Sequence, residues 1–449
     1  MVAQPSSPAR SIGPGYNRNP MLLKGAVVVM LDPPRVESSD LRVSGPRITE
    51  KGSGLSPADG EEVVDLDGAV LLPGLVNAHT HLYSTLARGL PPPLPPPKTF
   101  RQILERLWWR LDRALDEESV AVSALSGGLE AALSGTTVLI DHHSSPGFIR
   151  GSLDTVRGAL EQIGLRSCLC YEVTDRNGEE GVSQGLEENV AFQKNHQTPL
   201  TRGMVGAHAS LTLSEDTLDR LAGAVSDTGS SIHVHVGEDM ADVEDCRHRF
   251  TMTLRERLER HGLIVSRAIL AHCVHLAESE IEEVHRLGGW IAHNPRSNMN
   301  NAVGRAPVQA MKRAALGTDG VDQDMFAEVR SCYLMLRDAG QPKAAETALQ
   351  LLVGGHRLAA ALFGLPFGKL DAGAPADLLV LDYASPTPLH ADNVAGHLLF
   401  GLSRAHVESV MVAGRWVVRG RKPVAVDAGD VQRRAREVAG RLWQRVAKV

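Results

Sequence analysis

The stretch Leu72-Pro-Gly-Leu-Val-Asn-Ala-His-Thr-His81 joins a short apolar run to a pair of histidines. The apolar residues predict a buried strand, and His79 and His81 lie two positions apart where that strand ends. Side chains two apart on an extended strand leave the same side of the pleat, so both imidazoles can bind one cation. A His-x-His pair is weak evidence by itself, because structural histidines give the same pattern. A metal site therefore requires further ligands elsewhere in the chain.

The same arrangement, an apolar run followed by a polar side chain, recurs along the sequence. His208, His235, His272 and His293 each end such a run, and Gly317-Thr-Asp-Gly320 follows another. Polar side chains at the carboxyl ends of parallel strands gather at one end of a β-barrel. The imidazoles of His79, His81 and His235 and the carboxylate of Asp319 would form a mixed nitrogen and oxygen site suited to Zn²⁺, with Fe²⁺ or Mn²⁺ also possible.

Short apolar segments alternate with long helical stretches between residues 69 and 368. This alternation predicts an α/β protein with a (β/α)8 TIM barrel over these residues. The expected strands are Val70–Asn77, Thr136–Asp141, Arg166–Thr174, Met204–His208, Ser231–Val236, Ala268–His272, Gly289–His293 and Ala314–Thr318.

Both ends of the chain carry short β-rich runs instead. Residues 21–68 and 369–449 predict a small discontinuous β-sandwich domain beside the barrel, formed by the N- and C-terminal segments, with a helix at the end of the second segment. Residues 1–20 are rich in Ser, Pro, Gly and Asn and contain no apolar h-region. We expect a disordered tail there and no secretory signal.

The composition excludes several classes of function. The chain has 449 residues and a net charge of −6, so it lacks the basic footprint of a nucleic-acid-binding protein. No apolar run approaches the ~20 residues that a membrane span needs. The five cysteines are too few and too scattered for a disulfide framework, which predicts reduced thiols in a cytoplasmic protein. The expected partner is a small molecule.

These motifs resemble the amidohydrolase superfamily, in particular its aminohydrolase branch of cytosine, guanine and S-adenosylhomocysteine deaminases. Within that branch the chain is most similar to the SsnA-type aminohydrolases. The resemblance extends over nearly everything from Met21 onward. Besides the opening stretch, it rests on His235-Val-Gly-Glu238, Ala271-His-Cys-Val-His-Leu276, His293-Asn-Pro-Arg-Ser-Asn298, Gly317-Thr-Asp-Gly320 and Gly368-Lys-Leu-Asp-Ala-Gly-Ala-Pro-Ala-Asp377.

The resemblance implies a role for each residue of these motifs. His79, His81, His235 and Asp319 would bind a single divalent metal, most simply Zn²⁺. Glu238 would be the proton shuttle, and His272 would polarise the attacking water or the developing oxygen. Asp319 would act twice, as a metal ligand and as the acceptor of the water proton.

Four residues are expected to bind the substrate, although the sequence leaves alternatives for some of them. His208 ends an apolar run and should face the pocket, unless it is merely structural. Because side chains alternate along a strand, at most one of His142 and His143 should reach the cavity, and we favour His142. His293 resembles His208 in position, with Asn298 close by in the following loop.

The implied reaction is removal of an exocyclic amino group from a nitrogen heterocycle, such as the purine guanine or an oxidised guanine. One alternative is hydrolysis of another ring substituent, as in triazine chlorohydrolases. A second is a catalytically impaired homologue that still binds metal or ligand. The segment between Pro307 and Asp319 motivates the second, because it leaves little room for a helix, a turn and a full strand. A homodimer is also compatible with this branch of the superfamily.

Overall fold

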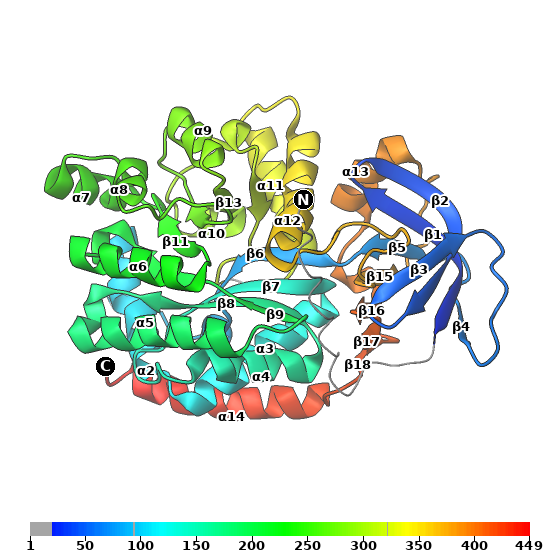
Figure 1. The fold of residues 1–449 in the computed structure, drawn as a ribbon, viewed down its shortest axis with the longest axis horizontal. Coiled ribbons are helices and arrows are strands. Elements are labelled where there is room, and N and C mark those ends of the chain that lie inside the picture. The colour runs from blue at the N-terminus through cyan, green and yellow to red at the C-terminus, as the bar shows by residue number, and fades with distance from the viewer. Residues whose placement is uncertain (1–19, 93–94, 321) are drawn as a thin grey trace, which may run out of the picture.

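The computed structural model describes residues 20–92, 95–320 and 322–449, and two sheets organise them (Figure 1). The expected tail at residues 1–20 lies outside the described residues, apart from Pro20. No helix in the described part of the chain is long and apolar enough to cross a membrane. The five cysteines are free thiols and all are buried.

One sheet is the predicted parallel barrel. Its strands follow one another in chain order as β6 (Leu75–Thr80), β7 (Thr136–His143), β8 (Arg166–Val173), β10 (Val205–Ala209), β11 (Ile232–Val236), β12 (Ile269–His272), β13 (Trp290–His293) and β14 (Ala314–Leu316), with β9 (Thr201–Gly203) beside β8. The ring is closed by residues that follow β14. The Asp319 amide donates to the His79 carbonyl oxygen over 2.9 Å, and Thr80 and Asp319 form a parallel bridge.

Helices cover the outside of this barrel (Figure 1). They are α3 (Glu117–Leu133), α4 (Ser152–Ile163), α5 (Gly178–Asn195), α6 (Glu215–Thr228), α7 (Met240–Phe250), α8 (Leu254–Arg260), α9 (Glu278–Arg286), α10 (Pro295–Asn300), α11 (Met325–Asp338) and α12 (Ala344–Phe363). Between β6 and α3 the chain forms the 3₁₀ helix η1 (Leu82–Ala87), α1 (Phe100–Ile103), the π-helix η2 (Leu104–Trp108) and α2 (Trp109–Ala114).

Apolar side chains at alternating strand positions fill the barrel. Val138 and Ile140 on β7 and Cys168 and Cys170 on β8 belong to one buried cluster, as strand periodicity requires. The barrel therefore has a packed floor, above which polar side chains can be held at the carboxyl ends of the strands.

The tight segment before Asp319 keeps its strand. β14 has three residues, fewer than the expected Ala314–Thr318, and the preceding helix α10 has only six. Gly317 makes the close approach of β14 to β6 possible, because a Cβ there would lie 2.8 Å from the His79 backbone nitrogen. Both elements are shortened, and Asp319 still reaches the rim of the barrel.

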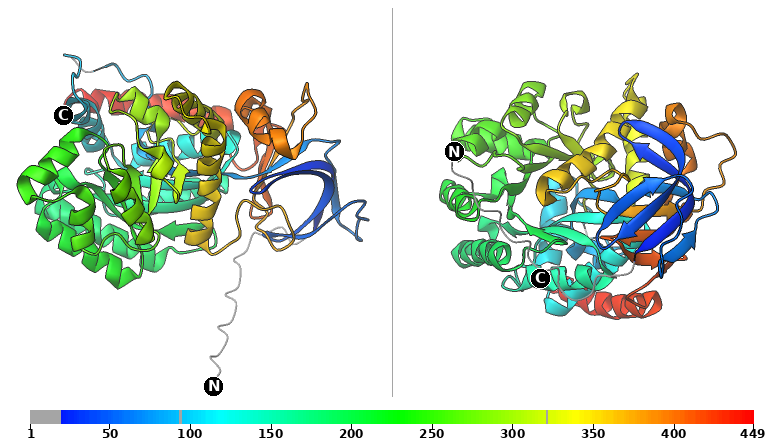
Figure 2. Two further views of the ribbon diagram at one scale, coloured as in Figure 1. Left: turned by 90° about the horizontal axis from the view of Figure 1, so that it is seen from above. Right: turned by 45° about the vertical axis from the view of Figure 1, so that its right-hand side comes forward.

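The second sheet combines both ends of the chain and stands to one side of the barrel (Figure 2). Its order is β18 (Lys422–Pro423), β17 (Arg415–Arg419), β16 (Val407–Val412), β15 (Leu378–Leu381), β5 (Val70–Pro73), β1 (Met21–Leu31), β2 (Pro34–Ser44) and β3 (Arg47–Gly52), with β4 (Glu62–Asp65) on β1. The discontinuous small domain is thus confirmed as a single mixed sheet. Four short helical segments lie between β15 and β16: η6 (Ala391–Asn393), α13 (Val394–Gly396), the π-helix η7 (His397–Gly401) and η8 (Arg404–His406).

Two details differ from the expected boundaries. The run expected as one strand at Val70–Asn77 divides at Gly74, because Pro73 cannot continue the ladder and the Gly74 amide donates to Asp377 of the small domain over 3.0 Å. β5 therefore belongs to the small sheet and β6 to the barrel. The last helix, α14 (Ala428–Val446), packs mainly against η1, α2 and α3 of the barrel. Its buried stripe of Val431, Val438 and Leu442 joins the barrel core.

Candidate active site

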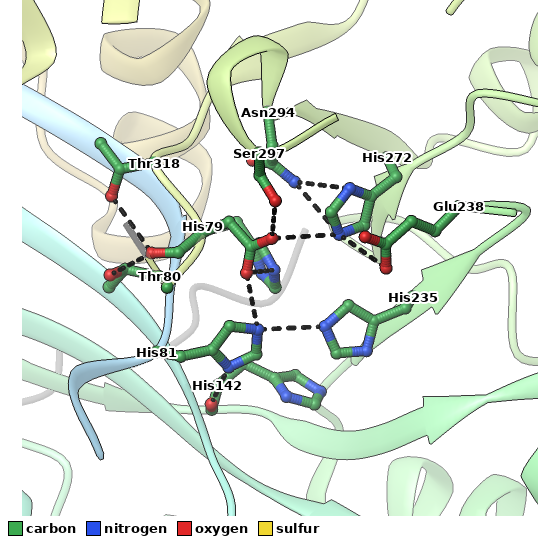
Figure 3. A network of polar contacts seen from close by, with 12 residues as sticks. His79, Thr80, His81, His142, His235, Glu238, His272, Asn294, Ser297 and Thr318 are labelled. Carbon is green, nitrogen blue, oxygen red and sulfur yellow. Dashed lines mark hydrogen bonds and ion pairs between the residues drawn. The ribbon is translucent and has the colours of Figure 1, made fainter. Parts of the chain in front are cut away.

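The four expected metal ligands meet at the carboxyl end of the barrel (Figure 3). His81 Nε2 lies 3.1 Å from Asp319 Oδ1 and 3.2 Å from His235 Nε2. His79 Nε2 lies 3.7 Å from the same carboxylate oxygen. All four side chains are buried. We call His79, His81, His235 and Asp319 the ligand cluster.

The hydrogen bonds of the three imidazoles show whether this cluster fits a metal. In each ring Nδ1 has a hydrogen-bonding partner. His81 Nδ1 lies 2.6 Å from the His142 carbonyl oxygen, and His235 Nδ1 lies 2.8 Å from the His208 carbonyl oxygen. His79 Nδ1 lies 2.9 Å from His233 Nε2. A carbonyl accepts only, so the proton of His81 and of His235 is on Nδ1. Their Nε2 lone pairs then face the centre, and His79 Nε2 is buried with no partner among the described residues. Such fixed tautomers are typical of zinc ligands.

Asp319 is held in a strained position. Its φ of 55° is unusual for a residue other than glycine. Thr80 Oγ1 donates to its carbonyl oxygen over 3.1 Å, and Ser297 Oγ donates to its Oδ2. These contacts, together with the backbone bond to His79, fix the direction of the carboxylate.

The charges in the cluster favour a cation beside Asp319. Burial alone would lower the pKa of His81, but hydrogen bonding to the Asp319 carboxylate raises it to about 9. Burial would raise the pKa of Asp319. The hydrogen bond and the charge of His81 have the larger effect and hold that pKa well below its usual range. A divalent metal supplies the positive charge that this carboxylate requires, so the residues present fit such an ion.

Glu238 and His272 lie beside the ligand cluster. Glu238 Oε2 is 3.5 Å from His272 Nε2, which in turn is 3.9 Å from Asp319 Oδ2. Burial raises the pKa of Glu238 to about 7. His272 Nδ1 donates to Asn298 Oδ1 over 2.8 Å, which directs Nε2 toward the two carboxylates. The arrangement places a carboxyl group that can exchange protons next to the metal ligands.

A cavity of about 470 Å³ opens over these groups. Of the expected residues, His81, His208, His235, Glu238 and Asp319 line it. His208 lies on β10 with Nδ1 2.6 Å from Thr212 Oγ1, and its contact with substrate stays a prediction.

Three residues expected to bind substrate do not line the cavity that the described residues form. His142 is fully buried, and its Nε2 lies 3.0 Å from the Ala207 carbonyl oxygen and 3.2 Å from the His233 carbonyl oxygen. His293 is buried where β13 pairs with β14. Asn298 faces His272 instead of the cavity. The structure therefore does not bring these three side chains to the cavity lining, and their contact with substrate stays a prediction.

The cavity lining also holds buried polar side chains that the sequence did not reveal, and one of them, Glu172, has an oxygen within 4.8 Å of a ring nitrogen of His235. Arg176 Nη2 lies 2.7 Å from Glu172 Oε1 and 3.8 Å from Asp112 Oδ2, and its guanidinium stacks 4.5 Å from the Trp109 ring centre. Burial raises the pKa of both carboxyl groups. Asp112 Oδ1 is buried and has no partner among the described residues. We call Trp109, Asp112, Glu172 and Arg176 the polar wall.

The sequence held partial signals for the residues that were missed. Ser297 and Asn294 stand inside the quoted Asn-Pro-Arg-Ser motif, and Asn294 Nδ2 lies 3.3 Å from His272 Nδ1. Glu172 interrupts an apolar strand, and Asp112 lies on the buried face of a short helix. A charged residue in a buried run is rare unless it is paired or functional.

Comparison with known proteins agrees with this geometry. The model of the amidohydrolase family matches residues 70–417. A 5-methylthioadenosine/S-adenosylhomocysteine deaminase of Desulforudis audaxviator is 33% identical over 433 residues, which cover 91% of this chain and 96% of the relative. The crystal structure of an adenosine deaminase from Xanthomonas campestris with bound zinc has a TM-score of 0.83 at 26% identity, over 96% of this chain and 99% of that chain.

A more distant solved structure supports the fold alone. The atrazine chlorohydrolase of Arthrobacter aurescens, complexed with zinc, has a TM-score of 0.80 at 23% identity, over 93% of this chain and 100% of that chain. The family model matches most of the chain, and the Desulforudis relative is similar along nearly its full length. This chain therefore belongs to the amidohydrolase family.

Proposed function

We propose that this chain is a zinc-dependent aminohydrolase that replaces the 6-amino group of an adenine nucleoside with oxygen and releases ammonia. The chain is a hydrolase that acts on carbon–nitrogen bonds other than peptide bonds. The observation that carries the proposal is the position of Glu238, which faces the cavity 3.5 Å from His272 and beside the ligand cluster.

The ligand cluster would hold one divalent metal, with His79, His81 and His235 as nitrogen ligands and Asp319 as the oxygen ligand. Such a metal acts as a Lewis acid that makes water a usable nucleophile near neutral pH. Zinc is the metal we propose, because this ligand set suits it and a similar deaminase structure contains it.

The chain's own residues move the protons. Asp319 accepts a proton from water as the water oxygen bonds to C6 of the ring. Glu238 gives a proton to the adjacent ring nitrogen N1, and the nearby His272 imidazole polarises the new oxygen. The amino group then takes the proton held by Asp319, its bond to C6 breaks, and ammonia leaves as the new C6 hydroxyl returns a proton to Glu238. A Glu238 pKa of about 7 suits a group that must both give and take a proton.

Two observations favour an adenine nucleoside over guanine. The relatives reported above are named for adenosine derivatives, and none of those names supports the guanine specificity that the sequence first suggested. The polar wall adds a chemical reason. The unpartnered Asp112 Oδ1 can accept a hydrogen bond from a hydroxyl group, which a nucleoside has and a free base lacks.

We also propose a cytoplasmic location, which the five free cysteines support. The alternative of a triazine-type reaction is supported only by similarity of fold, because the chlorohydrolase is just 23% identical to this chain. The impaired-homologue alternative loses its motive, because Asp319 lies in the ligand cluster despite the shortened segment.

An ammonia-release assay tests the proposal. Zinc-loaded protein should deaminate adenosine, 5'-methylthioadenosine or S-adenosylhomocysteine, and Glu238→Gln should abolish the signal. Guanine and atrazine serve as competing substrates in the same assay. Faster release of ammonia from guanine, or of chloride from atrazine, would contradict the assignment, and so would a silent zinc-loaded protein.

A further inference from the structure

Helix α14 runs along the side of the barrel and ends beside α2, far from the small sheet that precedes it in the chain (Figure 1). Two stretches of the cavity wall lie against its last turns. One is residues 82–89, which directly follow the metal ligand His81 and contribute Tyr83 and Arg88 to the cavity lining. The other is residues 100–114, which contribute Trp108, Trp109 and Asp112. We call these two stretches the wall segments.

Within the second wall segment, the part before α2 has little packing of its own, whereas η1 and α2 contain buried residues. Helix α1 has four residues and the π-helix η2 five, and neither contains a fully buried side chain. Short helices of this kind are marginal without outside contacts, because they form few internal hydrogen bonds. Their position therefore depends on what holds them from outside.

The first outside contact is made by Trp443 of α14. Its indole Nε1 donates to the Leu86 carbonyl oxygen over 2.8 Å, and a Cβ on Gly89 would lie 3.8 Å from its ring. Leu86 is in the last turn of η1, where carbonyl groups lack a partner within the helix. Trp443 thus caps the first wall segment.

The second contact is made by Arg445. Its Nε donates to the carbonyl oxygen of Ala114, the last residue of α2, over 2.8 Å. Its Nη2 lies 2.9 Å from Asp116 Oδ1, just beyond the same helix. Ala114 is two residues from Asp112 of the polar wall, so this contact fixes the end of the helix that carries Asp112.

A third contact runs in the opposite direction. Arg110 of α2 donates from Nε to the Val449 carbonyl oxygen over 2.8 Å and from Nη2 to the Val446 carbonyl oxygen over 2.9 Å. Arg110 directly follows Trp109, whose ring stacks on Arg176. α14 and α2 therefore hold one another through donors on both helices.

We propose that α14 is a brace for the substrate wall, and that Trp443 and Arg445 are positioning residues which set where Trp109 and Asp112 face the cavity. Neither residue lines the cavity, so each acts through a backbone carbonyl of a wall segment. The brace acts on the part of the substrate away from the amino-bearing carbon. Its effect on substrate rests on the proposed nucleoside deamination, whereas its effect on the wall segments does not.

Hydrogen exchange of the full chain tests the brace without reference to activity. Trp443→Phe keeps an aromatic ring at this position but removes the indole N–H donor. Arg445→Gln removes the guanidinium. In both variants the amides of residues 82–89 and 100–114 should exchange about tenfold faster, as expected for loss of one tertiary hydrogen bond. Arg434→Gln, which changes an exposed arginine of the same helix, is the matched control and should leave the exchange unchanged. Unchanged exchange in both test variants would overturn the brace.

Kinetics then test its role in substrate binding. With an adenine nucleoside, both variants should raise KM about fivefold and change kcat less than twofold, at unchanged zinc content. A loss confined to kcat, or an equal loss with adenine and its nucleoside, would overturn the positioning role. If the wild-type protein deaminates no nucleoside, the proposed function fails, and the exchange result still decides whether α14 braces the wall.

Discussion

The ligand cluster and the polar wall both contribute side chains to one cavity, but they are built in different ways. The cluster takes His79, His235 and Asp319 from strand ends that the barrel brings together. The wall takes Asp112 from the short helix α2, Arg176 from the 3₁₀ helix η3 (Asp175–Asn177) and Glu172 from the end of β8, and α14 supports it from outside. In the proposed function the barrel therefore supplies the groups that carry out the reaction, whereas elements added around the barrel contribute to the choice of substrate.

The largest effect is expected from removal of two ligands in the cluster. The double change His79→Ala and His81→Ala should abolish zinc loading and deamination, because one imidazole and one carboxylate are too few ligands for a tight site. Metal analysis of the purified protein checks this. His248→Ala, which alters an exposed histidine on α7, is the control and should load zinc normally. Normal zinc content in the double variant would refute the ligand assignment.

Glu238→Gln should lower kcat by about 10²–10⁴-fold, because the amide keeps the shape of the side chain but cannot transfer a proton. Zinc content and melting temperature should stay at wild-type values, since Glu238 is not a ligand. Glu244→Gln, on the exposed side of α7, provides the matched control. Near-normal kcat in Glu238→Gln would show that another acid transfers the proton.

Much of the cluster could be predicted from the sequence, and physical reasons explain where prediction stopped. Ligands at the ends of parallel strands must gather at one rim of the barrel. His81, His235 and Asp319 could therefore be predicted as ligands from the apolar runs that precede them. The direction of a side chain just past a strand end was not readable. His272 has a φ of 72°, and the register between β6 and β7 shifts near Thr80. The contact of Asn298 on α10 with His272 was likewise not readable, because it joins two elements that are separate in the sequence.

The polar wall escaped prediction for a different reason. Asp112 follows a long connection after β6, and the sequence does not say how that connection folds back over the barrel. The position of α14 was unreadable as well, because its buried stripe of Val438 and Leu442 fits any apolar surface. Local patterns give elements, but docking between distant segments depends on the whole fold.

Asp112→Asn tests the wall side of the comparison, with an intermediate effect. The amide offers one acceptor oxygen in place of two, so kcat/KM for an adenine nucleoside should fall about 10- to 100-fold. Deamination of free adenine, which has no hydroxyl group to bind, should change less than threefold. Equal losses for nucleoside and base would mean that Asp112 has no part in substrate choice.

Asn298→Ala should have the smallest effect, because Asn298 acts through His272. Loss of the acceptor for His272 Nδ1 should lower kcat about tenfold and leave KM and zinc content unchanged. Steady-state kinetics together with metal analysis check this. An increase in KM without loss of kcat would return Asn298 to the role of a direct substrate contact.

We propose that one metal, held by the ligand cluster, supports deamination of an adenine nucleoside. The most direct measurement is a titration of zinc into chelator-treated protein while ammonia release is followed. The predicted result is no activity at the start, followed by a linear rise that saturates at about one zinc per chain. Full activity before zinc is added, or saturation only at two zinc ions per chain, would contradict the account.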